Sequence, residues 1–142
     1  MWMSVDRYRD LGLLVIRFGF GLGFIAFFGL RMLLGGPEAW VARGVAVANF
    51  GITSGFVLWG LAAALTETLG ALFLILGWFC RPTVLALMAT MIVAATRHFV
   101  SGEGTPGHAF NNAWLFAGLF LTGPGRYSLD HLLASRRSRR QA

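Results

Sequence analysis

The sequence feature that most constrains the fold is the stretch from Leu61 to Arg81, which is almost wholly apolar and carries one carboxylate, Glu67, near its middle. About twenty apolar residues are enough for a helix to cross the hydrocarbon core of a bilayer, so this stretch predicts a transmembrane helix. A charged side chain at bilayer depth costs roughly 2.5–3.5 kcal/mol even on the most lenient insertion scales. We therefore expect Glu67 to face the protein interior and to have a partner there.

The composition places the whole chain in the membrane class. Hydrophobic residues make up 56% of the sequence and charged residues 13%, whereas a soluble domain carries about 25% charged residues. The net charge of +6 comes from arginines that lie mostly at the ends of apolar segments. Membrane topology explains arginines in such places, so no nucleic-acid partner is predicted. A single cysteine, Cys80, excludes an internal disulfide bond.

The apolar runs and the breaks between them predict one domain, residues 1–142, with four membrane-spanning helices. The spans cover about residues 11–34, 55–79, 83–100 and 109–122, and a basic tail follows at residues 123–142. Arg81 and Pro82 are expected to end the second span. Because the connections are short, neighbouring helices should run antiparallel. The predicted fold is therefore all-α: an up-down four-helix transmembrane bundle, with a short surface helix in the loop between the first two spans.

The arginines are distributed unequally between the two sides of this predicted bundle. The other side has three arginines, and the side that holds both termini has eight: Arg7, Arg9, Arg81, Arg126, Arg136, Arg137, Arg139 and Arg140. Arginine-rich loops stay in the cytoplasm, so both termini are predicted to be cytoplasmic.

Arg17 is the predicted partner of Glu67. It lies inside the first span, and with antiparallel spans the two residues differ in depth by only about 6–9 Å. Gly60, Ala64 and Ala71 share a helix face with Glu67, so this small-residue face should turn the acid toward another helix. Two interpretations stay open. The pair is a structural lock between the first two spans, or a buried charge there binds a polar headgroup or relays a proton.

A second polar group is predicted where the third and fourth spans meet. Arg97 and His98 end the third span, Glu103 and His108 lie in the loop that follows, and Asn111 and Asn112 lie in the first turn of the fourth. These residues could form the mouth of a site, in which the histidine donates to a quinone carbonyl or acts as a general acid. The alternative is an ordinary wet interface. His98, Glu103 and His108 are of metal-ligating types, but their spacing matches no zinc signature, so no metal site is predicted.

Three segments of the sequence resemble the DoxX family of four-span bacterial membrane proteins. They are LGLLVIRFGFGLGF in the first span, ALTETLGALFLILGWFCRPTVLAL across the second and third, and GPGRYSLD after the fourth. The resemblance covers most of residues 11–130 and implies a bacterial inner-membrane location. Arg17, Glu67 and His98 match polar positions typical of the family. Members often carry His-Gly near the end of the first span, with a lysine three residues after the histidine, where this chain has Phe28-Gly29 and Arg31-Met32.

The resemblance also sets the functional expectations, because family members are associated with redox complexes that include quinone-linked thiosulfate oxidation. The first expectation is a membrane subunit of a redox complex, which handles a quinone or anchors an oxidoreductase. The alternative is a non-catalytic structural or assembly subunit, and a weaker one is a small-molecule carrier. No covalently bound cofactor is expected, and a quinone is the predicted ligand. The expected partners are the lipid bilayer and other membrane subunits or a second copy of the chain.

Overall fold

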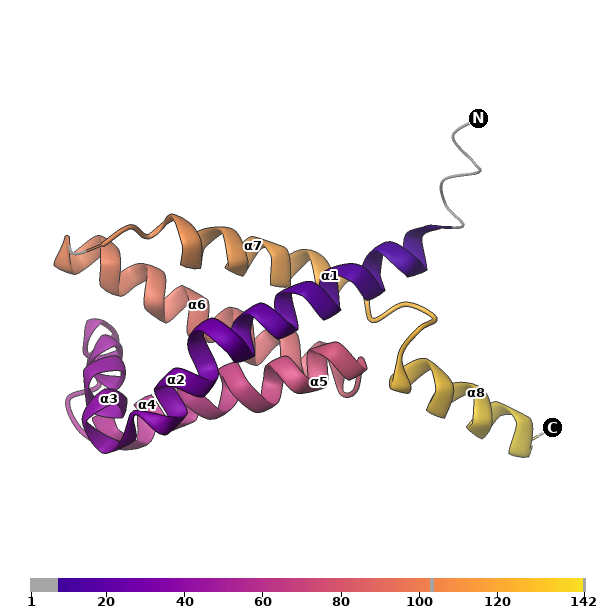
Figure 1. Cartoon of the computed structure of the whole chain (residues 1–142), viewed down its shortest axis with the longest axis horizontal. Coiled ribbons are helices and arrows are strands. Elements are labelled where there is room, and N and C mark those ends of the chain that lie inside the picture. The colour runs from indigo at the N-terminus through magenta and orange to yellow at the C-terminus, as the bar shows by residue number, and fades with distance from the viewer. Residues whose placement is uncertain (1–7, 103, 142) are drawn as a thin grey trace.

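The computed structural model describes residues 8–102 and 104–141 of the chain (Figure 1). Two residues used in the predictions above, Arg7 and Glu103, lie outside the described residues. Every regular element in the described part is a helix, which confirms the all-α prediction. In chain order the elements are α1 (Arg9–Phe24), η3 (Ile25–Gly29), α2 (Leu30–Leu34), α3 (Gly36–Gly44), η4 (Val45–Phe50), α4 (Phe56–Leu65), η5 (Thr66–Gly70), α5 (Ala71–Leu76), α6 (Cys80–Ser101), α7 (Gly107–Thr122) and α8 (Leu129–Gln141).

Three continuous helical segments of the described chain are long and apolar enough to cross a membrane. They are Arg9–Leu34, with 26 residues, Phe56–Leu76, with 21, and Cys80–Ser101, with 22. The chain is therefore an integral membrane protein in contact with the lipid bilayer. The fourth predicted span corresponds to α7, which packs along α6. It has 16 residues and is about 24 Å long, which is shorter than the roughly 30 Å of a hydrocarbon core.

The long helical segments run back and forth along one long axis, and α3 lies across it, so the molecule has two ends (Figure 1). The start of α1, the turn between α5 and α6, the end of α7 and all of α8 lie at one end, which we call the termini end. The hairpin of α3 and α4 lies at the other end, together with the connection between α6 and α7, and we call this the α3 end. These two ends carry the polar features of the molecule.

The turn between the second and third helical segments differs from its prediction. The second segment ends at Leu76, because Gly77 and Phe79 both have positive φ, of 62° and 46°. The third begins at Cys80 rather than near residue 83, because the Asp130 carboxylate accepts hydrogen bonds from the backbone N–H groups of Phe79 and Cys80, both at 2.9 Å. Pro82 then lies in the first helical turn, where its missing N–H has no cost. It does not end a helix.

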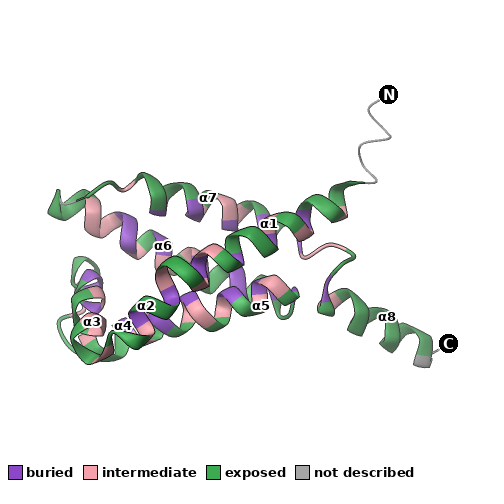
Figure 2. Cartoon of the chain, viewed as in Figure 1, coloured by how far each residue is buried: buried purple, intermediate pink, exposed green. Residues whose placement is uncertain are grey.

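Burial follows the pattern of a protein surrounded by lipid. The facing sides of the central helices are buried and their outer faces are exposed (Figure 2). Leu74, Leu87 and Phe116 are fully enclosed, whereas Phe27, Leu58 and Trp114 are among many large apolar side chains that point outward. An apolar outer surface of this extent is unfavourable in water and suits a bilayer.

Glycines decide which helices approach closely. A Cβ atom on Gly60 would overlap the backbone of Trp40, and one on Gly44 would overlap the carbonyl of Phe56, so α3 and α4 pack backbone to backbone. By contrast, a Cβ on Gly19 would meet nothing within 4 Å. The connection between the first two helical segments thus contains a helix, α3, which packs closely on α4. Within the predicted basic tail, α8 is a further helix that we did not predict.

Candidate functional site

Glu67 lies at a local irregularity in the second helical segment. It belongs to η5, a π-helical turn, and η3 is a second π-helical turn in the first segment. The two turns meet, because a Cβ atom on Gly29 of η3 would lie 2.7–2.8 Å from the backbone carbonyl group of Glu67. Single π-helical turns widen a helix locally and occur often at functional sites. The position of Glu67 is therefore fixed by the π-helical turn η5 and by the close contact of η3 with it.

The partner of Glu67 in the structure is Arg43 of α3. Arg43 Nη2 lies 3.4 Å from Glu67 Oε2, and Arg43 Nε lies 3.3 Å from the sulfur of Met32. Glu67 is 1% exposed, while the Arg43 side chain is one-third exposed. The carboxylate is thus buried against a cation that reaches it from the α3 end. The small-residue face predicted around Glu67 is confirmed, since Gly60, Ala64 and Ala71 are all buried with it.

The predicted pair between Arg17 and Glu67 is wrong. Gly29 lies beside Glu67 and is twelve residues after Arg17, so the two charges are separated by about 18 Å along the helix axis. Gly21, one turn after Arg17, packs instead against Ala71 and Ile75. The two charges would lie at similar depths only if both helices started at matched levels. The register of the glycine contacts places Arg17 near the termini end of the second segment.

Arg17 is fully buried there, among backbone carbonyl groups. It donates from Nη2 to the carbonyl oxygen of Tyr127, in the segment between α7 and α8, and from Nη1 to that of Leu74 at 3.5 Å. Its Nε is buried without a hydrogen-bond partner among the described residues. The packing is tight, because a Cβ atom on Gly77 would overlap the guanidinium group. Arg17 therefore joins the first helix to the segment that follows α7.

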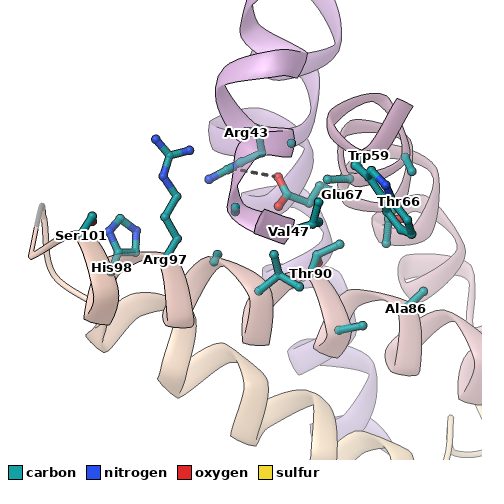
Figure 3. A pocket seen from close by; sticks show the side chains of 17 residues that line it. Arg43, Val47, Trp59, Thr66, Glu67, Ala86, Thr90, Arg97, His98 and Ser101 are labelled. Atoms are coloured by element: carbon teal, nitrogen blue, oxygen red, sulfur yellow. Dashed lines mark hydrogen bonds and ion pairs between the residues drawn. The ribbon is translucent and has the colours of Figure 1, made fainter. Parts of the chain in front are cut away.

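A cavity of about 400 Å³ lies beside Glu67, between α3 with η4, α4 with η5, and α6 (Figure 3). We call it the Glu67 pocket. Its lining residues are Arg43, Gly44, Ala46, Val47, Trp59, Ala62, Ala63, Thr66, Glu67, Ala86, Ala89, Thr90, Val93, Ala94, Arg97, His98 and Ser101. Six of these are alanine, and their short side chains leave the space open. A volume of this size is typical of a small-molecule site.

The polar lining residues are divided between the middle of the pocket and the α3 end. Arg43 and Glu67 contact each other at one side of the pocket, and Arg97, His98 and Ser101 follow one another along α6 (Figure 3). Arg97 donates from Nη1 to the carbonyl oxygen of Ala42, so α6 is tied to α3 at this point. The pocket therefore offers one carboxylate, two guanidinium groups, an imidazole and the hydroxyl groups of Thr66, Thr90 and Ser101, within walls that are otherwise apolar.

The two predicted asparagines do not line this pocket. Asn112 is buried and lies 3.0 Å from His108, Nδ2 to Nε2. The His108 ring in turn stacks on Phe28, with ring centroids 4.8 Å apart. Asn111 is exposed on the outer side of α7. The five predicted site residues thus fall into three places: Glu67 and His98 in the pocket, Arg17 at the termini end, and the asparagines on α7.

The charged pocket residue that the sequence did not point to is Arg43. Arg43 was counted only as a topology signal, although it lies in the loop that was expected to cover the bundle. Arg97, in contrast, was predicted together with His98 as part of the polar group at the end of the third span. The signal that could have identified Arg43 is the pair Gly44 and Gly60, since two small residues allow α3 to reach the depth of the acid. Among the described residues, no group of three histidine, cysteine or acidic side chains is placed to hold a metal ion.

Comparison with known families gives one match. The family model named DoxX matches residues 12–100, which include Arg17, Arg43, Glu67, Arg97 and His98. The resemblance seen in the sequence is thereby confirmed. No curated protein and no solved structure matches the chain.

Proposed function

The chain belongs to the DoxX family, and from that premise we propose that it is a membrane subunit of a redox complex that holds a quinone headgroup in the Glu67 pocket. The observation that carries the proposal is the pocket itself. It combines a buried carboxylate, paired with Arg43, with alanine-rich walls in a space of about 400 Å³. A quinone needs hydrogen-bond donors for its carbonyl oxygens and a flat apolar space for its ring.

The donors in the pocket suit both quinone oxygens. Guanidinium groups are permanent donors, and Arg43 and Arg97 present theirs from two different helices. Glu67 would accept a proton from a bound quinol when the rest of the redox complex takes its electrons, and His98 would add a ring nitrogen at the α3 end of the pocket. Trp59 on α4 is half-exposed and forms part of the wall, so the isoprenoid tail would leave the pocket beside it, toward lipid.

We also propose that α7 is the fourth span, that the protein lies in a bacterial inner membrane and that both termini are cytoplasmic. The charge distribution supports this orientation. Six exposed arginines lie at the termini end, namely Arg9, Arg81, Arg126, Arg136, Arg137 and Arg139. The α3 end carries Arg31, Arg43 and Arg97, two of which have partners within the protein. The helix α3 would then cover the Glu67 pocket on the periplasmic side.

The test is to measure quinone bound to the full chain after purification in mild detergent, by extraction and chromatography. Ala63→Leu, which fills part of the pocket, should lower the bound quinone severalfold. Ala26→Leu is the matched control, because Ala26 is exposed on η3 and lies outside the pocket. Equal quinone contents in the wild-type protein and the Ala63→Leu variant would refute the quinone site.

A structural subunit without a ligand is the second candidate, and one observation favours it. Arg43 ties α3 to η5, and Arg97 ties α6 to α3, so the same polar residues can hold the bundle together without a bound molecule. Copurification of partner subunits in the absence of any quinone would support this candidate. The third possibility, a small-molecule carrier, stays a prediction from the sequence.

A further inference from the structure

The termini end has a groove that the proposed function does not use. It lies between the turn that joins α5 to α6 and one face of α8, and has a volume of about 500 Å³. We call it the α8 groove. Trp78 and Phe79 form one wall, and Leu133, Arg137 and Ser138 of α8 form the other. We propose that the α8 groove binds one anionic phospholipid, with the phosphate at Arg137 and an acyl chain along the aromatic wall.

The aromatic wall is held outward at a cost in backbone energy. Phe79 has a φ of 46°, a conformation that strains a side chain of this size. Its side chain is 57% exposed, and its ring lies 5.2 Å from that of Trp78. Asp130 keeps the turn in this shape, because one of its oxygens accepts from Phe79 N–H and the other from Cys80 N–H. Strain that the surrounding structure maintains is often linked to a binding role.

The opposite wall combines apolar and basic side chains along α8. Leu133 is exposed on the groove side, and Arg137 lies one turn further along the helix. Arg136 and Arg139 are exposed next to it. The groove therefore changes from aromatic and aliphatic to cationic along its length, which is the order of an acyl chain and its phosphate.

Charge at this end favours an anionic ligand. Among the described side chains at the termini end, there are six exposed arginines and two aspartates, Asp10 and Asp130. Asp130 is occupied by the two backbone N–H groups of the turn, and Asp10 accepts from the backbone N–H of Arg126 at 3.0 Å. The basic side chains are thus left to attract anions from outside the protein.

The location favours a lipid over an acidic protein segment. Trp78 and Phe79 directly follow the apolar segment Phe56–Leu76, so they lie where a span reaches the membrane interface. A tryptophan with an exposed apolar face suits that region, where phosphates and acyl chains meet. An acidic peptide would use the arginines and would gain nothing from the exposed Phe79 ring.

The test uses the delipidated full chain in detergent, with native mass spectrometry to count bound phosphatidylglycerol against phosphatidylcholine. The wild-type protein should prefer phosphatidylglycerol. Arg137→Gln should reduce that preference by about fivefold. Arg126→Gln is the matched control, because Arg126 is an exposed arginine at the same end but outside the groove.

A second variant separates binding from folding. Phe79→Gly relieves the strained φ, so it should unfold no more easily than the wild-type protein, yet it should lose bound phosphatidylglycerol because one of the two rings of the aromatic wall is gone. Three outcomes would overturn the proposal: equal binding of the two lipids, an equal loss in the Arg126→Gln control, or retention of a poly-glutamate peptide without any lipid preference. The last would identify an acidic protein as the occupant. Because the groove and the Glu67 pocket lie at opposite ends, loss of one ligand leaves the other measurable.

Discussion

The α3 end and the termini end each contain one buried charged side chain, and their surroundings differ. Glu67, towards the α3 end, lies beside a cavity of about 400 Å³ and is paired with an arginine that is one-third exposed. Arg17, at the termini end, is enclosed by backbone carbonyl groups and by Gly77, with no room for an added Cβ atom. Both lie within residues 12–100, which the DoxX family model matches. Burial of a charge therefore does not identify a binding site by itself, and the space beside the charge makes the distinction.

The largest effect is expected where the packing is tight. Arg17→Ala should lower the free energy of unfolding by about 3–5 kcal/mol, because it removes charge-assisted hydrogen bonds to two carbonyl groups and leaves a cavity. Arg17→Met, which keeps most of the volume, should lose less. Unfolding of both variants can be followed by circular dichroism during titration with SDS. An Arg17→Ala variant as stable as the wild-type protein would contradict the comparison between the two ends, because it would show that Arg17 does not stabilise the fold.

The next effect tests how the pocket is enclosed. Gly60→Ala should cost about 2–3 kcal/mol, because its Cβ would overlap the backbone of Trp40 and push α3 away from α4. Gly19→Ala is the control and should be neutral or stabilising by about 0.5–1 kcal/mol, since its Cβ meets nothing and alanine favours a helix. The same titration measures both. If the two variants unfold alike, α3 is not packed on α4 as described.

The smallest effect is expected at Glu67. Glu67→Gln should lower stability by only about 1 kcal/mol, because the lost attraction to Arg43 is partly offset by the lower cost of burying a neutral amide. The same variant should weaken quinone binding more clearly than it weakens folding. Parallel measurements of SDS unfolding and bound quinone would sharpen the comparison between the ends. A loss of stability as large as that of Arg17→Ala would mean that Glu67 is a structural residue.

The sequence predicted the three long apolar helical segments well, because apolar length and arginine-bearing breaks are local signals. Membership of the DoxX family was also evident from local motifs. The turn at Trp78 was predicted poorly, because it depends on Asp130, about fifty residues later in the chain. No periodicity in the second span could reveal that a distant carboxylate supplies the helix cap.

The candidate site was predicted only in part, for a related reason. Glu67 and His98 were identified by their residue types in apolar surroundings. The partner of Glu67 depends on the register between two helices, which the contacts of Gly21 and Gly29 fix. Arg43 lies in a connection whose depth the sequence alone does not specify. The pocket could be predicted only from both the helix register and the depth of Arg43. The alanines that line it look like ordinary helix-forming residues in the sequence, and the space beside them appears only when three helices are placed around them.

The bond between Arg17 and Tyr127 has a consequence for the order of synthesis. Arg17 enters the membrane with the first helix, but the carbonyl group that it needs follows 110 residues later. At a translation rate of about 5–20 residues per second, the arginine waits roughly 5–20 s for that partner. Only about 12 Å of helix separates it from Arg9, so its long side chain can meanwhile reach the aqueous boundary. We therefore expect the Arg17 guanidinium of the nascent protein to stay near the membrane surface until the segment after α7 is made and the Tyr127 carbonyl accepts its hydrogen bond.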